Sequence, residues 1–345
     1  MKSTLKPRIR RYYTTIFHAP DIVELRYGVW NPLSVNLKDG KKRGLLSPII
    51  ALLDGTKTIN EIAKHAGCSL SDIYGVIEQL QVVNAIENDA ETALDAYLDQ
   101  LIPAFQGRSN PAQQPVLVLG DEWFVQLLTD LMKPVLPDTR FSGLPPDIAE
   151  LWEATRAHAI HDDLKDSQLY RFFDHHVNEF VIFGSQHVDP IKSLVLNRVL
   201  VGQRIPHLYV CMDGPFVFVG PTVIPGHTAC FECLEKRVQM NLREHASYVA
   251  YKDALVAGSV TPGNPAFLQP VRTLMASHAA LEAINFLSTG STFTRNKVLS
   301  VYLPTMEIVF NEFLRMPDCG TCAPSTSMEH TELHFDLYAL LASRR

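Results

Sequence analysis

The sequence of 345 residues lacks an uninterrupted apolar run long enough to cross a bilayer. Its basic N-terminal segment, residues 1–11, is not followed by the apolar stretch of a signal peptide. Basic residues are not in excess either, because 31 Lys and Arg stand against 37 Asp and Glu, which gives a formal net charge of −6. Neutralising nucleic-acid phosphates requires a basic surface. These absences predict a cytoplasmic protein that partners neither a membrane nor nucleic acid.

Cysteine is scarce, with six in the chain, but four of the six form two widely separated C-x-x-C pairs. Two thiolates at this spacing can bind one tetrahedral ion, and two pairs supply the four sulfur ligands of a structural zinc site. The predicted ligands are Cys230, Cys233, Cys319 and Cys322. The alternatives are two disulfides, unrelated thiols or a redox pair, although a redox pair would normally occur once. Metal thiolates suit a reducing compartment.

The first hundred residues, 1–102, contain signals for short strands followed by helices. Apolar and polar residues alternate over 16–37, as in strands. Helix starts follow, and the clearest are Thr58 with Glu61, which form a capping box, and Ser69. The second and third helices read as a helix-turn-helix, with residues 82–86 as a wing. We therefore expect an N-terminal winged-helix α+β domain.

Winged helices often bind DNA, but the would-be recognition helix over 69–84 carries Asp72 and Glu78 and no Lys or Arg. A sheet edge beside an apolar helix face can instead accept a peptide as an added strand. Alternatively, the helix residues pack the core of the small domain. The candidate peptide-binding residues are Leu33, Val35, Leu37, Ile73, Val76, Ile77 and Leu80.

Residues 103–115 are rich in turn formers and are expected to be a linker to a second domain over 116–323. That domain begins with an apolar strand, 116–119, and a helix over 123–133, the usual start of a doubly wound, Rossmann-type α/β sheet. The tail, 324–345, reads as a mobile stretch and then a short amphipathic element that docks on a partner or on its own domain.

The turn after the first strand of this sheet has one glycine, Gly120, followed by two carboxylates and two bulky rings. A nucleotide-binding turn would continue with two more glycines, because the backbone must approach the phosphates closely. The turn therefore predicts no phosphate cradle.

Two resemblances follow from these motifs. The order of strands, helices and wing over 16–88 resembles the precursor-peptide recognition element of enzymes that modify ribosomally made peptides (RiPP biosynthesis). The run 220–226, both C-x-x-C pairs and the helix over 267–287 resemble the ThiF and ubiquitin-activating-enzyme superfamily. Within it, the chain is most similar to the leader-binding partners of azoline-forming cyclodehydratases. There, a YcaO enzyme phosphorylates the amide backbone using ATP, while the ThiF-like partner captures the leader peptide.

Adenylating members of that superfamily carry a Gly-rich loop, an Asp after a middle strand, and an Arg about four residues before an Asn. In this chain Gly120, Asp189 and Asn197 match those positions, and Ser193 stands where the Arg would be. Without the other glycines and the Arg, the triphosphate loses backbone donors and a cation. The resemblance thus implies a degenerate nucleotide site and puts ATP binding in doubt.

The function that the resemblance implies is a non-catalytic subunit. It would bind the leader of a ribosomal precursor peptide and present the core to a YcaO-type cyclodehydratase, as a homodimer with structural zinc. One alternative is a stand-alone ATP-dependent ThiF-like enzyme that adenylates or dehydrates peptide carboxyls. The other is a winged-helix DNA-binding regulator.

Overall fold

The chain divides into two compact units, Met1–Gln106 and Gly107–Arg345, each with its own apolar core. The computed structural model describes residues 5–30, 33–87, 93–101, 114–155, 167–261, 263 and 267–323. Most of the predicted linker and the whole of the tail 324–345 lie outside these ranges. No helix within these ranges has the length and apolar character needed to span a membrane.

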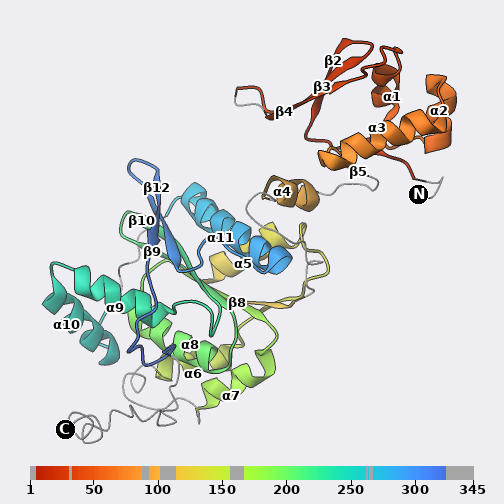
Figure 1. The fold of residues 1–345 in the computed structure, drawn as a ribbon. Coiled ribbons are helices and arrows are strands. Elements are labelled where there is room, and N and C mark those ends of the chain that lie inside the picture. Colours follow the sequence, from red (N-terminus) through yellow and green to blue (C-terminus); the bar gives the residue numbers. More distant parts are fainter. Residues whose placement is uncertain are drawn as a thin grey trace, which may run out of the picture. The chain divides into compact units, whose positions relative to one another are not determined.

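The described part of the first unit contains two small antiparallel sheets and four helices (Figure 1). One sheet has the order β2-β3-β4, and the other pairs β1 with β5. The elements are β1 (Arg8–Ile9), β2 (Thr14–Ala19), β3 (Ile22–Tyr27), β4 (Leu33–Lys38), α1 (Leu46–Leu52), α2 (Ile59–Ala66), α3 (Leu70–Val82), β5 (Ile86–Glu87) and α4 (Ala93–Leu101).

The predicted starts of α2 and α3 are confirmed. The Thr58 side chain accepts a hydrogen bond from the Glu61 backbone N–H, and Glu61 accepts one from the backbone N–H of Thr58. Ser69 and Asp72 form the same reciprocal box at α3. The predicted wing is different. Residues 82–86 comprise the end of α3, a turn and the start of β5, which pairs with β1 because Ile86 fills the small core.

The second unit is a mixed α/β layer structure around a seven-stranded sheet, which confirms the predicted α/β class. The sheet order is β12-β11-β10-β9-β8-β6-β7. Strands β7, β6, β8 and β9 run parallel, and the pairings from β9 to β12 are antiparallel. The strands are β6 (Val116–Gly120), β7 (Phe141–Gly143), β8 (Phe180–Ser185), β9 (His207–Asp213), β10 (Phe216–Val223), β11 (Lys297–Tyr302) and β12 (Glu307–Glu312).

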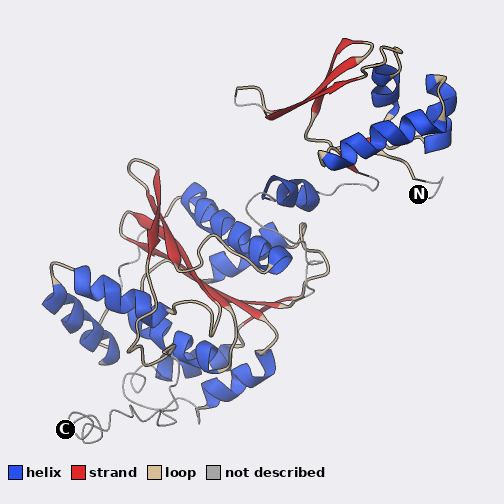
Figure 2. Ribbon diagram, viewed as in Figure 1, coloured by secondary structure: helices blue, strands red, loops and turns tan. Residues whose placement is uncertain are grey.

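Helices cover both faces of this sheet, with α5 and α11 on one face and α6, α7, α8 and α9 on the other (Figure 2). This double cover explains why residues 116–119 of β6 form a continuous apolar run that is at most 1% exposed. The helices are α5 (Glu122–Met132), α6 (Pro146–Thr155), α7 (Gln168–Phe173), α8 (Pro190–Gly202), α9 (Phe231–Asn241), α10 (His245–Val256) and α11 (Gln269–Thr289), with a short 3₁₀ turn, η2 (Asp174–His176).

Candidate functional site

The two C-x-x-C pairs meet in one buried cluster. Cys230 caps the N-terminus of α9 and Cys233 lies in its first turn, while Cys319 and Cys322 belong to the turn after β12. The four sulfur atoms lie within 4.8 Å of one another, with 3.6 Å between Cys230 and Cys319 and 3.4 Å between Cys233 and Cys322. A tetrahedral Zn–S distance of about 2.3 Å requires sulfurs about 3.8 Å apart. The cluster can thus hold one metal ion, and its donor set is consistent with zinc.

Side chains around the cluster fix both cysteine segments to the rest of the unit. The amide oxygen of Asn197 accepts a hydrogen bond from the Phe231 backbone N–H at 2.9 Å, and that of Asn296 accepts one from the Ala229 N–H at 2.8 Å. The Met316 N–H lies 3.3 Å from the Cys233 sulfur, the geometry of a hydrogen bond to a thiolate.

Glu232 connects the two C-x-x-C segments directly. Its buried carboxylate accepts a hydrogen bond from the Thr321 hydroxyl, which lies between Cys319 and Cys322. The same carboxylate lies 3.3 Å from the Lys236 Nζ and 3.7 Å from the Arg198 Nε. Four thiolates around a divalent ion carry a net charge of −2, so cations at this distance offset part of it.

The carboxyl end of β6, where a nucleotide-binding turn would lie, is closely packed. Gly120 has φ +117, and a Cβ at this position would lie 1.7 Å from the Gly184 carbonyl oxygen on β8. A Cβ on Gly184 would in turn lie 2.1 Å from the Phe124 ring. The glycine that matches the nucleotide-binding turn therefore has a packing role, because two strands and one ring approach each other here.

The other two positions carried over from adenylating proteins also have structural partners. Asp189 caps α8, and its carboxylate accepts the Lys192 backbone N–H at 2.9 Å. Asn197 is fully buried and supports the α9 start described above, so it does not line the strand ends. Asp121 at the β6 turn accepts the Gln186 backbone N–H at 2.6 Å. The structure thus does not bring Gly120, Asp189 and Asn197 together as one set of ligand contacts.

A hollow lies at the carboxyl ends of β6 and β7, lined in part by Gly120, Glu122, Gly143, Trp152 and Lys192. The Lys192 Nζ lies 4.6 Å from the centre of the Trp152 ring, in cation–π contact. Among the described residues that line the hollow, Lys192 is the one cation. Trp152 is only 3% exposed, so its ring is covered, and Lys192 is the group of this hollow that could contact a phosphate.

In the first unit, the predicted peptide-binding residues separate into core and surface. Leu37, Ile73, Ile77 and Leu80 belong to the core and are 7%, 0%, 2% and 0% exposed, so they cannot contact a peptide without opening it. The apolar face of α3 packs in the core of its own unit, where α3 contacts α1, α2 and β5, which is the alternative that the sequence left open. Val35 and Val76 are partly buried, and Leu33 is 71% exposed.

Sequence reasoning missed the exposed residues beside Leu33. Val29 and Trp30, in the turn that follows β3, are 76% and 98% exposed. Cross-strand register places Leu33, Val35 and Leu37 on the same face as the buried residues of β3. Exposure increases from Leu37 to Leu33, so this end of β4 extends beyond the core and presents apolar groups. Alternation alone predicted the face of the strand, but not where the helices stop covering it.

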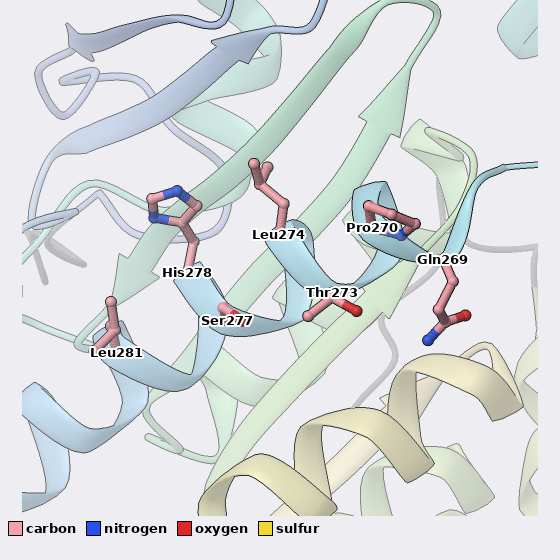
Figure 3. Close-up of a pocket in the computed structure, with 7 residues that line it drawn as sticks. All are labelled: Gln269, Pro270, Thr273, Leu274, Ser277, His278 and Leu281. Atoms are coloured by element: carbon pink, nitrogen blue, oxygen red, sulfur yellow. The ribbon is translucent and has the colours of Figure 1, made fainter.

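A further open hollow follows one face of α11 (Figure 3). Its residues come from successive turns of the helix and include Leu274, Ser277, His278 and Leu281. Partial burial lowers the pKa of His278. No acid lines the hollow, and no hydrogen bond joins the imidazole to the Ser277 or Thr273 hydroxyl among the described residues, so these side chains form no recognisable catalytic pair.

No protein-family model matches this sequence, and no curated protein matches it. Solved structures do match its fold. The heterocyclase TruD superposes with a TM-score of 0.65 at 18% identity, over 92% of this chain and 43% of TruD. A heterocyclase in complex with substrate and cofactor gives 0.66 at 18% identity, over 94% of this chain and 40% of its own. MccB of E. coli with AMPCPP and MccA gives 0.53 at 16% identity, over 92% and 99%.

These similarities cover both units and show a shared fold. The chain spans less than half the length of the heterocyclases and nearly all of MccB. The predicted α/β architecture is consistent with these structures.

Proposed function

We propose that this protein binds the leader of a ribosomally made precursor peptide and presents the core to a YcaO-type, ATP-dependent cyclodehydratase that forms azolines. The first unit would act as a winged-helix precursor-peptide recognition element. The observation that carries the proposal is the free edge of β4, which pairs only with β3 within the described part of the chain. A peptide can add to such an edge as a further strand.

The exposed apolar groups at one end of β4 support this proposal. A leader strand laid along β4 would cover Leu33 and approach Val29 and Trp30. Burying these side chains supplies affinity, and the pockets between them supply sequence preference. An unpaired, apolar edge is otherwise a liability for aggregation. Protein partners that cover such an edge remove that liability.

Leu33→Asp tests the proposal, with Ser34→Asp as the matched control. Both residues are exposed and adjacent on β4, but they face opposite sides of the sheet. Leader binding is measured by fluorescence anisotropy with the labelled leader of the precursor peptide encoded beside this gene. Leu33→Asp should weaken binding at least about tenfold, because a charge replaces a buried apolar contact worth about 1.5 kcal/mol or more. Equal affinities for the two variants would refute binding at this edge.

The competing function is a stand-alone ATP-dependent enzyme. The hollow beside Lys192 and Trp152 favours it, as do the MccB structures with AMPCPP and with ATP. Calorimetry with ATP separates the two proposals. A stand-alone enzyme must bind ATP and release AMP or ADP when it acts on a peptide, whereas a delivery subunit binds the leader equally well with or without ATP.

We further propose that the four cysteines bind zinc.

We also propose that the protein is a homodimer. All six residues of the edge strand β12 are exposed, including Ile308, Val309 and Phe310 at 52%, 43% and 44%. An apolar edge of this kind favours pairing with a second strand. Sedimentation should therefore give twice the chain mass, and Val309→Lys should give a monomer. Thr305→Lys, in the exposed turn before β12, is the control.

A further inference from the structure

The second unit contains a cavity of 240 Å³ on the sheet face covered by α8 and α9. Its walls come from the carboxyl ends of β8 and β9, from β10 and from helices α8, α9 and α10, and most of them are apolar. The volume lies below the roughly 300–1,000 Å³ of a typical small-molecule site. It therefore suits one long side chain of a larger ligand.

The charged groups that line the cavity are acidic. Asp189, Asp213 and Glu235 line it, together with His187, and no Lys or Arg is among the described lining residues. Asp213 is exposed and forms no ion pair with a described residue. Burial, with a further contribution from the Asp213 carboxylate, raises the pKa of the neighbouring Cys211 to about 12. An anionic ligand would therefore be repelled here, and a cationic one attracted.

One wall already holds a cation of the chain itself. The Lys252 ammonium lies 2.7 Å from the Glu235 Oε1 and 5.5 Å from the centre of the Tyr248 ring. The Glu235 carboxylate is therefore already paired with a cation of the chain, and an added cation would pair with Asp213 instead. Phe218, Tyr209 and Phe231 supply more aromatic surface around the same cavity. A flat guanidinium group stacks on such rings and pairs with carboxylates, whereas its apolar stem can lie along the walls.

We propose that this cavity binds an arginine side chain of the peptide that the protein presents. This inference rests on the proposed function, because it gives the second unit its own contact with the precursor peptide.

The test uses the full chain and two matched probes, Nα-acetyl-arginine amide and Nα-acetyl-citrulline amide, which differ in charge and have nearly the same shape. Binding is measured by ligand-observed NMR titration. The arginine probe should bind at least about tenfold more tightly than the citrulline probe, because hydrogen bonds to charged groups are the stronger kind. Equal binding, or no binding of the arginine probe at millimolar concentration, would overturn the proposal.

Variants then locate the binding. Val238 lines the cavity and is 43% exposed, so Val238→Trp should fill the cavity and abolish binding while the protein stays folded, as checked by its melting temperature. Asp213→Asn should weaken binding of the arginine probe about threefold, because an exposed ion pair contributes a free energy of about this size. Asp253→Asn, an exposed acid of α10 outside the cavity, should change nothing. Unchanged affinity in Val238→Trp would place the probe elsewhere and reject the cavity.

Leader binding measured on the same samples separates this inference from the proposed function. The Leu33→Asp protein should lose affinity for the leader and bind the arginine probe as tightly as the unsubstituted protein. A wild-type protein that binds leader but no arginine probe would reject only the cavity. One that binds the probe but no leader would reject the leader-binding function.

Discussion

At the residue scale, the four cysteines join α9 to a turn far along the chain. Both segments also have contacts that need no metal, from Asn197 and from Glu232 with Thr321. A bound ion adds its binding free energy directly to folding. Cys319→Ser should therefore lose the bound zinc and lower the stability of the second unit by several kcal/mol.

Metal content by atomic emission, together with thermal unfolding, measures this effect. Cys68→Ser is the control, because Cys68 lies in the first unit, outside the cluster. A Cys319→Ser protein with full zinc content and unchanged stability would contradict the four-thiolate site.

His207, the first residue of β9, predicts a pH dependence. Its ring is buried, Nδ1 lies 2.8 Å from the Ile205 carbonyl oxygen, and Nε2 has no partner among the described residues. Burial lowers its pKa from 6.5 to about 4, so the folded state favours neutral imidazole. The contribution of the neutral His207 ring to the free energy of unfolding is fully present above pH 6.5. It is lost as the pH falls toward 4, and the loss reaches about 3 kcal/mol.

Urea unfolding of the second unit at pH 7, 5 and 4 measures this loss. His207→Gln removes the titrating group and should flatten the dependence over this range. Parallel curves for the two proteins would show that other groups cause the acid sensitivity.

The residues also show which parts of the site the sequence could predict. Cysteine spacing predicted the four-cysteine cluster because two C-x-x-C pairs supply the four thiolates that a tetrahedral ion takes. The apolar positions of α3 did not show whether this face binds a peptide or packs in the core, because both roles require the same helical period. Ile73, Ile77 and Leu80 were thus assigned to a peptide surface and are core residues.

At the element scale, the pairing of β6 with β8 depends on a close backbone approach. Gly120→Ala would place a methyl group 1.7 Å from the Gly184 oxygen at a φ of +117. We expect a loss of about 3 kcal/mol or more, from overpacking and backbone strain together. Gly143→Ala, at the end of β7, is the matched control, because nothing lies within 4 Å of its added Cβ.

Chemical unfolding of the two alanine variants measures this difference. Gly143→Ala should stay within about 0.5 kcal/mol of the unsubstituted protein. A Gly120→Ala protein of ordinary stability would mean that the strand end is open and free to approach a ligand.

Element boundaries were predictable where the local signals are strong. The capping boxes of α2 and α3 set the helix starts at Thr58 and Ser69. Proline usually interrupts a strand, because it has no N–H for the ladder. Pro221 nevertheless lies within one strand, β10, in which a register shift between Val219 and Thr222 accommodates it. The strand continues through the proline because β10 pairs with β9, and the local sequence does not indicate this pairing.

At the scale of the whole molecule, the two units have separate apolar cores, and one of them holds the cysteine cluster. Composition and the turn-rich segment 103–115 predicted two domains, and the structure divides the chain after Gln106. We therefore expect each core to unfold on its own. Thermal unfolding should therefore show two transitions rather than one.

Ligands should move these transitions separately, because a ligand stabilises only the unit that binds it. Removing zinc with a strong chelator should lower the transition of the second unit and leave the first unchanged. Adding leader peptide at 100 times its dissociation constant should stabilise the first unit by about 2.7 kcal/mol. Differential scanning calorimetry measures both shifts, and a single transition that responds to both ligands would mean that the units unfold as one.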